Sequence, residues 1–182
     1  AWTGTTDLMV HPADLYVGLR TERYFVQQGE PLNVEMIVTD LDGNLVEDRP
    51  VQVQASRLEW KYQDGRWQEV EVDTQECQLG SGLEPEICEF STPVGGRYRI
   101  TALVEDSSGR VNQSQLTRWV SGGEQPPARN VEREQVTLIP DQDSYQPGET
   151  AEILDQAPFS SGQGRLTISS SGIVTSETFK MD

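Results

Sequence analysis

Two cysteines are the residues of this chain that could form a covalent bond with each other. Cys77 and Cys88 stand eleven positions apart in a loop-like run, 76–88, whose glycines and proline let the backbone fold back. A disulfide between them would stabilise the fold by about 3 kcal/mol on the chain-entropy estimate and would point to an exported protein. The alternative is two reduced thiols, since spacing alone does not prove pairing.

The other titratable residues predict no catalytic, cofactor or metal site. His11 is the only histidine, whereas a nucleophile–base pair or a zinc site needs several such groups close together. The run 40–44 resembles the start of a calcium-binding loop, but Leu45 occupies the position that needs glycine and Val51 the position that needs glutamate. We therefore expect a chain that is not an enzyme and that binds neither a cofactor nor a metal.

Three aromatic side chains could together make a surface contact. Trp60, Tyr62 and Trp67 lie close in sequence, and their rings could form a platform for a sugar. The alternative is that these rings pack over the edge of a sheet or under the cysteine run, as large aromatic residues in strands more often do.

The pair Asp64-Gly65, between these aromatic residues, predicts a β-hairpin because both residue types tolerate the positive φ angles of a two-residue turn. With that turn, Tyr62 lies opposite Trp67. The valines of the second arm, among them Val70, then face away from the aromatic residues. Either a bulge changes the register of the two arms or both faces are partly covered.

The composition limits the classes of partner. The 182 residues include 30 acidic and 14 basic side chains, which give a formal net charge of −16. This charge disfavours nucleic acid and anionic membrane surfaces, because both are polyanions. No apolar run approaches the roughly 20 residues of a membrane-spanning helix. No signal peptide is visible at Ala1, so we expect a chain that starts after processing or inside a longer protein.

Alternating apolar and polar residues predict strands along most of the chain. In the run 24–39, a turn around Gly29 is followed by an apolar residue at every second position from Leu32 to Val38, which indicates a strand with one buried face. Similar alternation recurs at 50–55 and 96–106, and no segment reads as a long amphipathic helix. The predicted fold class is all-β, with tandem β-sandwiches of the immunoglobulin or fibronectin type.

The strand start at Gly29-Glu30 recurs at Gly148-Glu149, 119 residues later, which predicts two copies of one β-domain. The second copy has about four strands, too few to close a sandwich, so we expect it to be truncated. The glycines and prolines after residue 121 predict a boundary. The predicted divisions are 1–14, the end of an upstream domain or a linker; 15–122, the first sandwich; 123–135, a Gly/Pro linker; and 136–182, the N-terminal half of the second sandwich.

Taken in order, these segments resemble a known family. Residues 145–151, 157–159, 166–168 and 172–175 look like the macroglobulin-like domain that precedes the bait region in bacterial alpha-2-macroglobulins. Residues 25–38, 40–44, 58–62 and 96–106 resemble the neighbouring macroglobulin-like domain. The resemblance implies neighbouring macroglobulin-like domains in one long chain, proteases as targets, and a periplasmic, cell-surface or extracellular location. In this family a protease cuts the bait region, the molecule rearranges, and in many members a Cys-x-Glu-Gln thioester reacts with the attacker.

Two departures from the family pattern narrow the expected role. The residues after Cys77 and after Cys88 do not match the thioester motif, and no bait segment is identifiable. We therefore expect a non-catalytic scaffold fragment of a protease-trapping inhibitor, without bait region or thioester. The alternative is an immunoglobulin-like surface adhesin or carbohydrate-binding module that uses Trp60, Tyr62 and Trp67.

Overall fold

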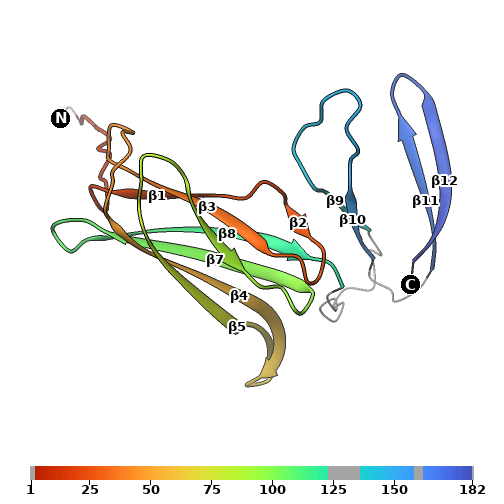
Figure 1. Ribbon diagram of the computed structural model, residues 1–182, viewed down its shortest axis with the longest axis horizontal. Coiled ribbons are helices and arrows are strands. Elements are labelled where there is room, and N and C mark those ends of the chain that lie inside the picture. The colour runs from red at the N-terminus through yellow and green to blue at the C-terminus, as the bar shows by residue number, and fades with distance from the viewer. Residues whose placement is uncertain (1–2, 123–135, 158–161, 182) are drawn as a thin grey trace.

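The computed structural model describes residues 3–122, 136–157 and 162–181 (Figure 1). Over these ranges the chain forms twelve strands and no helix, so the all-β prediction is confirmed. Within the same ranges, no helix is long and apolar enough to span a membrane. The predicted linker, 123–135, lies outside the described residues, and the predicted domain boundaries stay predictions.

The first eight strands make up what we call the first β-unit. Their bounds are β1 (Tyr16–Arg20), β2 (Phe25–Val26), β3 (Leu32–Thr39), β4 (Pro50–Gln63), β5 (Arg66–Gly80), β6 (Glu86–Phe90), β7 (Gly96–Glu105) and β8 (Val111–Val120). They form a three-stranded sheet in the order β1-β3-β6 and a five-stranded sheet in the order β2-β8-β7-β4-β5. Strand β2 runs parallel to β8, and the other neighbours are antiparallel.

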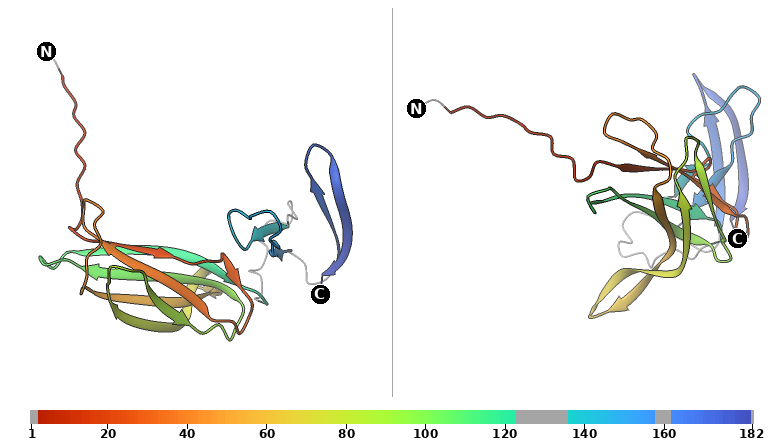
Figure 2. Two further views of the ribbon diagram at one scale, coloured as in Figure 1. Left: turned by 45° about the horizontal axis from the view of Figure 1, so that its top comes forward. Right: turned by 60° about the vertical axis from the view of Figure 1, so that its left-hand side comes forward.

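The two sheets pack face to face and enclose one apolar core (Figure 2). The alternation read in the sequence places side chains as predicted: the four apolar residues of β3 from Leu32 to Val38 are buried. On the facing sheet, Val51, Val53 and Ala55 of β4 are also buried. Burial of such side chains is the main favourable contribution to folding, so this core holds the first β-unit together.

The turn before β3 depends on a glycine. Gly29 has a φ of +90°, and its amide donates to the carbonyl of Thr92 (2.8 Å). The Glu30 amide donates to the carbonyl of Gln27 (3.0 Å), and the Gln27 amide donates back to the Glu30 carboxylate (3.0 Å). This closed turn directs the chain from the edge of one sheet into the other.

We expect Gly29→Ala to lower the free energy of unfolding by about 1 kcal/mol, because a Cβ disfavours positive φ. An added Cβ at Gly29 would have open space around it, so the loss would come from the backbone alone. Gly80→Ala is the matched control, since Gly80 also has open space but no positive φ. Urea denaturation measures both values, and equal losses for the two variants would contradict this account.

The remaining four strands make up the second β-unit. Their bounds are β9 (Thr137–Pro140), β10 (Ile153–Gln156), β11 (Gly162–Ser169) and β12 (Ile173–Met181). Strand β9 pairs with β10, and β11 pairs with β12, in two separate two-stranded sheets. The second copy therefore has four strands, as predicted. Ser171 and Gly172, both of which have positive φ, lie in the turn that joins β11 to β12.

The two copies of the predicted repeat pair their strands in the same register. Leu19 pairs with Met36 in β1–β3, and Leu138 pairs with Asp155 in β9–β10; both residues of the second pair lie 119 positions after those of the first. The turns match as well: Gly148 has a φ of +96°, like Gly29. The second β-unit thus repeats the first pairing of the first β-unit.

Two local predictions need correction. The run 76–88 is mostly strand rather than loop, because β5 continues to Gly80 and β6 begins at Glu86. Because Asp-Gly-Asn residues tolerate positive φ, the run 40–44 also predicts a hairpin; the turn forms, but the pairing is limited to one isolated bridge between Thr39 and Leu45. The chain then crosses to the five-stranded sheet, where the alternating apolar residues of β4 find the facing half of the core.

Candidate functional site on the outer face of the five-stranded sheet

The two cysteines lie in different sheets and form a disulfide. Cys77 is in β5 and Cys88 is in β6, with their Cα atoms 6.0 Å apart. Cys77 pairs with Val53 of β4, and Cys88 pairs with Val34 of β3, so the bridge links the two sheets through the core. Both sulfurs are therefore occupied, and neither cysteine offers a thiol for nucleophilic attack or metal binding.

His11 lies on the exposed segment that precedes β1 (Figure 2). Its Nδ1 atom is 2.9 Å from the hydroxyl of Tyr16, and its ring meets the Tyr16 ring edge-on. Among the described residues, no three or more histidine, cysteine, aspartate or glutamate side chains gather where they could hold a metal ion. His11 thus acts here as a hydrogen-bonded surface residue.

The aromatic residues lie on the outer face, by which we mean the side of the five-stranded sheet that points away from the core. The β4–β5 hairpin that carries them extends beyond the other strands (Figure 1). Tyr62 pairs with Trp67, as predicted, and a register shift between Ala55 and Arg57 supplies a bulge. Trp60 and Tyr62 are 43% and 61% exposed, so they do not pack beneath the cysteine run.

The three rings do not form one flat platform. The Tyr62 and Trp67 rings are 5.7 Å apart at an interplanar angle of 65°, an edge-to-face arrangement. A sugar stacks best on a flat, exposed ring face, which this pair does not present jointly. The prediction of a surface contact at Trp60, Tyr62 and Trp67 stays a prediction.

Paired charges lie beside the aromatic residues on the same face. Glu69 of β5 forms ion pairs with Arg97 and Arg99 of β7, and Glu71 pairs with Arg99 at 2.8 Å. The Arg97 guanidinium also lies 5.9 Å from the centre of the Trp119 ring. A face with exposed aromatic rings and arginines is typical of protein–protein contacts.

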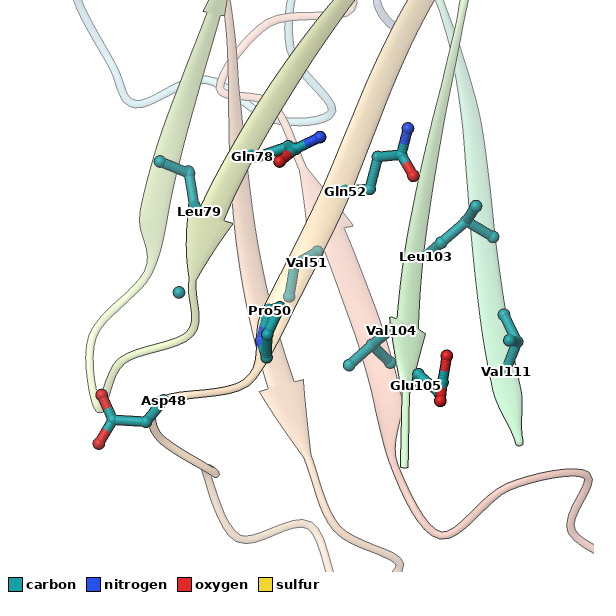
Figure 3. Close-up of a pocket in the computed structure, with 11 residues that line it drawn as sticks. Asp48, Pro50, Val51, Gln52, Gln78, Leu79, Leu103, Val104, Glu105 and Val111 are labelled. Atoms are coloured by element: carbon teal, nitrogen blue, oxygen red, sulfur yellow. The ribbon is translucent and has the colours of Figure 1, made fainter. Parts of the chain in front are cut away.

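A hollow of about 730 Å³ opens at the other end of the sheet (Figure 3). Amides of Gln52 and Gln78 lie side by side there, with the carboxylates of Asp48 and Glu105 at the rim and Val111 half-exposed. The residues that line it include no histidine, cysteine or serine. The hollow can therefore take up a polar or apolar surface segment.

The buried carboxylate of Asp106 was not predicted from the sequence. Asp106 is buried at the β7–β8 turn, where its carboxylate accepts hydrogen bonds from the amides of Asp14 (3.0 Å), Ser108 (2.8 Å) and Arg110 (3.0 Å). These backbone hydrogen bonds, the Asp14 amide first, lower the pKa of Asp106 to about 2 against the opposing effect of desolvation. Asp40 makes the same turn, and the shared spacing Asp-x-x-Gly was the available signal.

Asp106→Asn should make the free energy of unfolding depend less on pH between about pH 4 and pH 2. The pKa of Asp106 is about 2 in the folded chain against 3.8 for the free side chain, so the ionised form favours folding. This contribution is complete above about pH 4 and is lost as the pH falls through about 2. Urea denaturation between pH 2 and 6 measures the difference between variant and wild type. Asp42→Asn, at an exposed position of the related turn, is the control. An equal loss of pH dependence in this variant would contradict the role given to Asp106.

The sequence of this chain is similar to that of a known protein. No protein-family model matches the chain. Its sequence is 22% identical over 160 residues to the alpha-2-macroglobulin homolog of a Nostoc species, over 84% of this chain. The predicted relationship to bacterial alpha-2-macroglobulins is confirmed. The chain spans only 8% of the length of that homolog.

Solved structures give similar but weaker matches. The native conformation of Escherichia coli alpha-2-macroglobulin matches 94% of this chain and 13% of its own, with 20% identity and a TM-score of 0.46. The sporulation control protein Spo0M of Bacillus subtilis matches 80% of this chain, with 11% identity and a TM-score of 0.44.

Proposed function

We propose that this chain is a non-catalytic scaffold segment of an alpha-2-macroglobulin-like inhibitor that traps proteases. The observation that carries the proposal is the sequence match to the Nostoc alpha-2-macroglobulin homolog, which runs through 84% of the chain. In the proposed role, the two β-units space and orient neighbouring macroglobulin-like domains of one long protein. Proteases are the targets of that whole protein.

The chemistry of the segment fits a scaffold better than a reactive part of the trap. A thioester needs a cysteine whose sulfur is free to be acylated, and Cys77 and Cys88 bond to each other. The bait region and any thioester would then belong to other parts of the protein. The exposed aromatic rings and arginines of the outer face would serve as contacts with neighbouring domains.

The disulfide also supports an exported location. Disulfides persist in the periplasm, at the cell surface and outside the cell, and are rare in the reducing cytosol. Fractionation of the native organism followed by blotting for this chain should therefore find it outside the cytosol. Recovery in the cytosolic fraction would overturn the proposed location.

A protease assay tests the proposed role. The isolated chain and the whole gene product that contains it are each incubated with trypsin, and cleavage of a large protein and of a small peptide substrate is measured. We expect the whole protein to block cleavage of the large substrate and to spare the small one, and the isolated chain to change neither. Inhibition by the isolated chain would overturn the scaffold role, and absence of trapping by the whole protein would overturn the inhibitor role.

The adhesin or carbohydrate-binding alternative rests on the aromatic residues of the outer face. The edge-to-face geometry of Tyr62 and Trp67 gives it no support. If these side chains make only protein contacts, the double variant Trp60→Ala/Trp67→Ala should leave the signal on a glycan array unchanged. Glycan binding that is lost in this variant would favour the alternative.

A further inference from the structure

A set of polar contacts joins the two β-units where β2 begins. The backbone amide of Tyr24 donates to the carbonyl of Asp141 (2.9 Å), and the Tyr24 hydroxyl donates to the carboxylate of Asp143 (2.5 Å). Arg23 pairs with the carboxylates of Asp141 (3.4 Å) and Glu152. Figure 1 shows the β9–β10 hairpin beside β2. We call this set of contacts the joint.

The second β-unit holds its side of the joint in place. Asp141 is only 4% exposed, and its Oδ1 atom accepts hydrogen bonds from the Tyr145 hydroxyl (2.7 Å) and the Glu152 amide (2.9 Å). Its own amide donates to the carbonyl of Glu152 (2.9 Å). These internal bonds fix Asp141 so that its carbonyl and its second carboxylate oxygen face Tyr24 and Arg23.

The first β-unit holds the other side in place. The carbonyl of Tyr24 accepts a hydrogen bond from the Trp119 amide of β8 (3.2 Å), and the Arg118 guanidinium lies 4.9 Å from the centre of the Tyr24 ring. The Arg23 guanidinium lies 5.4 Å from the centre of the buried Phe25 ring. Arg23 and Tyr24 are therefore also held by contacts with their own sheet.

The joint is polar rather than apolar. The core cluster of the first β-unit contains no described residue from the second, and Leu138 and Ile153 of the second remain exposed. Charge-assisted hydrogen bonds of this kind are directional, but salt screens them where they reach solvent. Separation of such an interface breaks no part of the core of the first β-unit.

We propose that Arg23 and Tyr24 form a docking site for the acidic turn that begins at Asp141, and that this joint sets the angle between the first β-unit and the β9–β10 hairpin. The joint can open and close without unfolding the first β-unit. The proposal rests on the contacts within this chain and does not depend on the function proposed above.

Distance measurement between two spin labels tests the proposal on the full 182-residue chain. Labels are placed at Ser108→Cys in the first β-unit and Thr150→Cys in the second, both at exposed positions, with the native disulfide intact. We expect one narrow distance distribution at low salt. Arg23→Ala, or Glu152→Gln on the facing side, should replace it with a broad one. About 1 M salt should do the same, because the screening length then falls to about 3 Å.

Arg20→Ala is the matched control. Arg20 lies three residues before Arg23 and pairs with Glu35 inside the first β-unit, so its loss should leave the distribution narrow. Unchanged tryptophan fluorescence in Arg23→Ala would show that the first β-unit stays folded. A distribution that stays narrow both in Arg23→Ala and in high salt would overturn the proposal, as would a broad distribution in the wild-type chain.

Discussion

Phe90→Ala should lower the free energy of unfolding of the first β-unit by about 3–5 kcal/mol, the range for removing a large aromatic side chain from a packed core. Phe90 ends β6, pairs with Leu32 of β3 and is 1% exposed within the core cluster. Its ring thus fills space between the two sheets that alanine would leave as a cavity. Urea denaturation followed by tryptophan fluorescence measures the loss, since all four tryptophans precede residue 123.

The same strand supplies the control for this prediction. Ile87 lies three residues earlier in β6 and is 57% exposed, so Ile87→Ala removes apolar atoms without opening a cavity. We expect it to change the free energy of unfolding by no more than about 0.5 kcal/mol, as is usual for surface substitutions. Comparable losses in the two variants would mean that β6 does not cover the core in the way that the structure shows.

The buried strands could be predicted because alternation reports burial directly. In β3, every second residue meets the facing sheet, and each of those residues from Leu32 to Val38 is buried. The repeat was predictable for a related reason: a turn such as Gly29-Glu30 needs particular residue types, so a second copy leaves the same signature at Gly148-Glu149. Its register in β9–β10 then follows the first copy.

The cysteine run shows where local composition misleads. Glycine and proline between Cys77 and Cys88 favour a loop, but they mark only the connection from Gly80 to Glu86, and both cysteines lie in strands. The signal that these strands belong to different sheets is not local. It depends on β5 pairing with β4 and β6 pairing with β3, which neither strand specifies by itself.

The remaining features depend on partners far apart in the sequence. The Asp-x-x-Gly spacing predicts a turn at Asp106, but not that its carboxylate also binds the amide of Asp14, 92 residues away. Similarly, Tyr24 and Asp143 are 119 residues apart, and each is an ordinary surface residue within its own unit. Such contacts arise from the relative placement of whole sheets, which hydrophobic periodicity does not encode.

Removing the disulfide should cost less than Phe90→Ala but more than the other substitutions. The double variant Cys77→Ser/Cys88→Ser is expected to lower the free energy of unfolding by about 3 kcal/mol, because the bridge limits the freedom of the unfolded chain across an eleven-residue separation. Urea denaturation of the variant and of the wild-type chain measures this loss. Mass spectrometry of unreduced peptides checks that Cys77 and Cys88 are joined in the starting material.

Reduction of the wild-type chain is the internal control, since it breaks the same bond without changing the side-chain atoms around it. If the bridge acts through the unfolded chain, reduced wild type and the double variant should have similar free energies of unfolding, both below that of the oxidised wild type. A variant that is much less stable than reduced wild type would instead show that serine hydroxyls are poorly accommodated beside Val34 and Val53. Free thiols in the native protein would remove both the stabilising role and the argument for export.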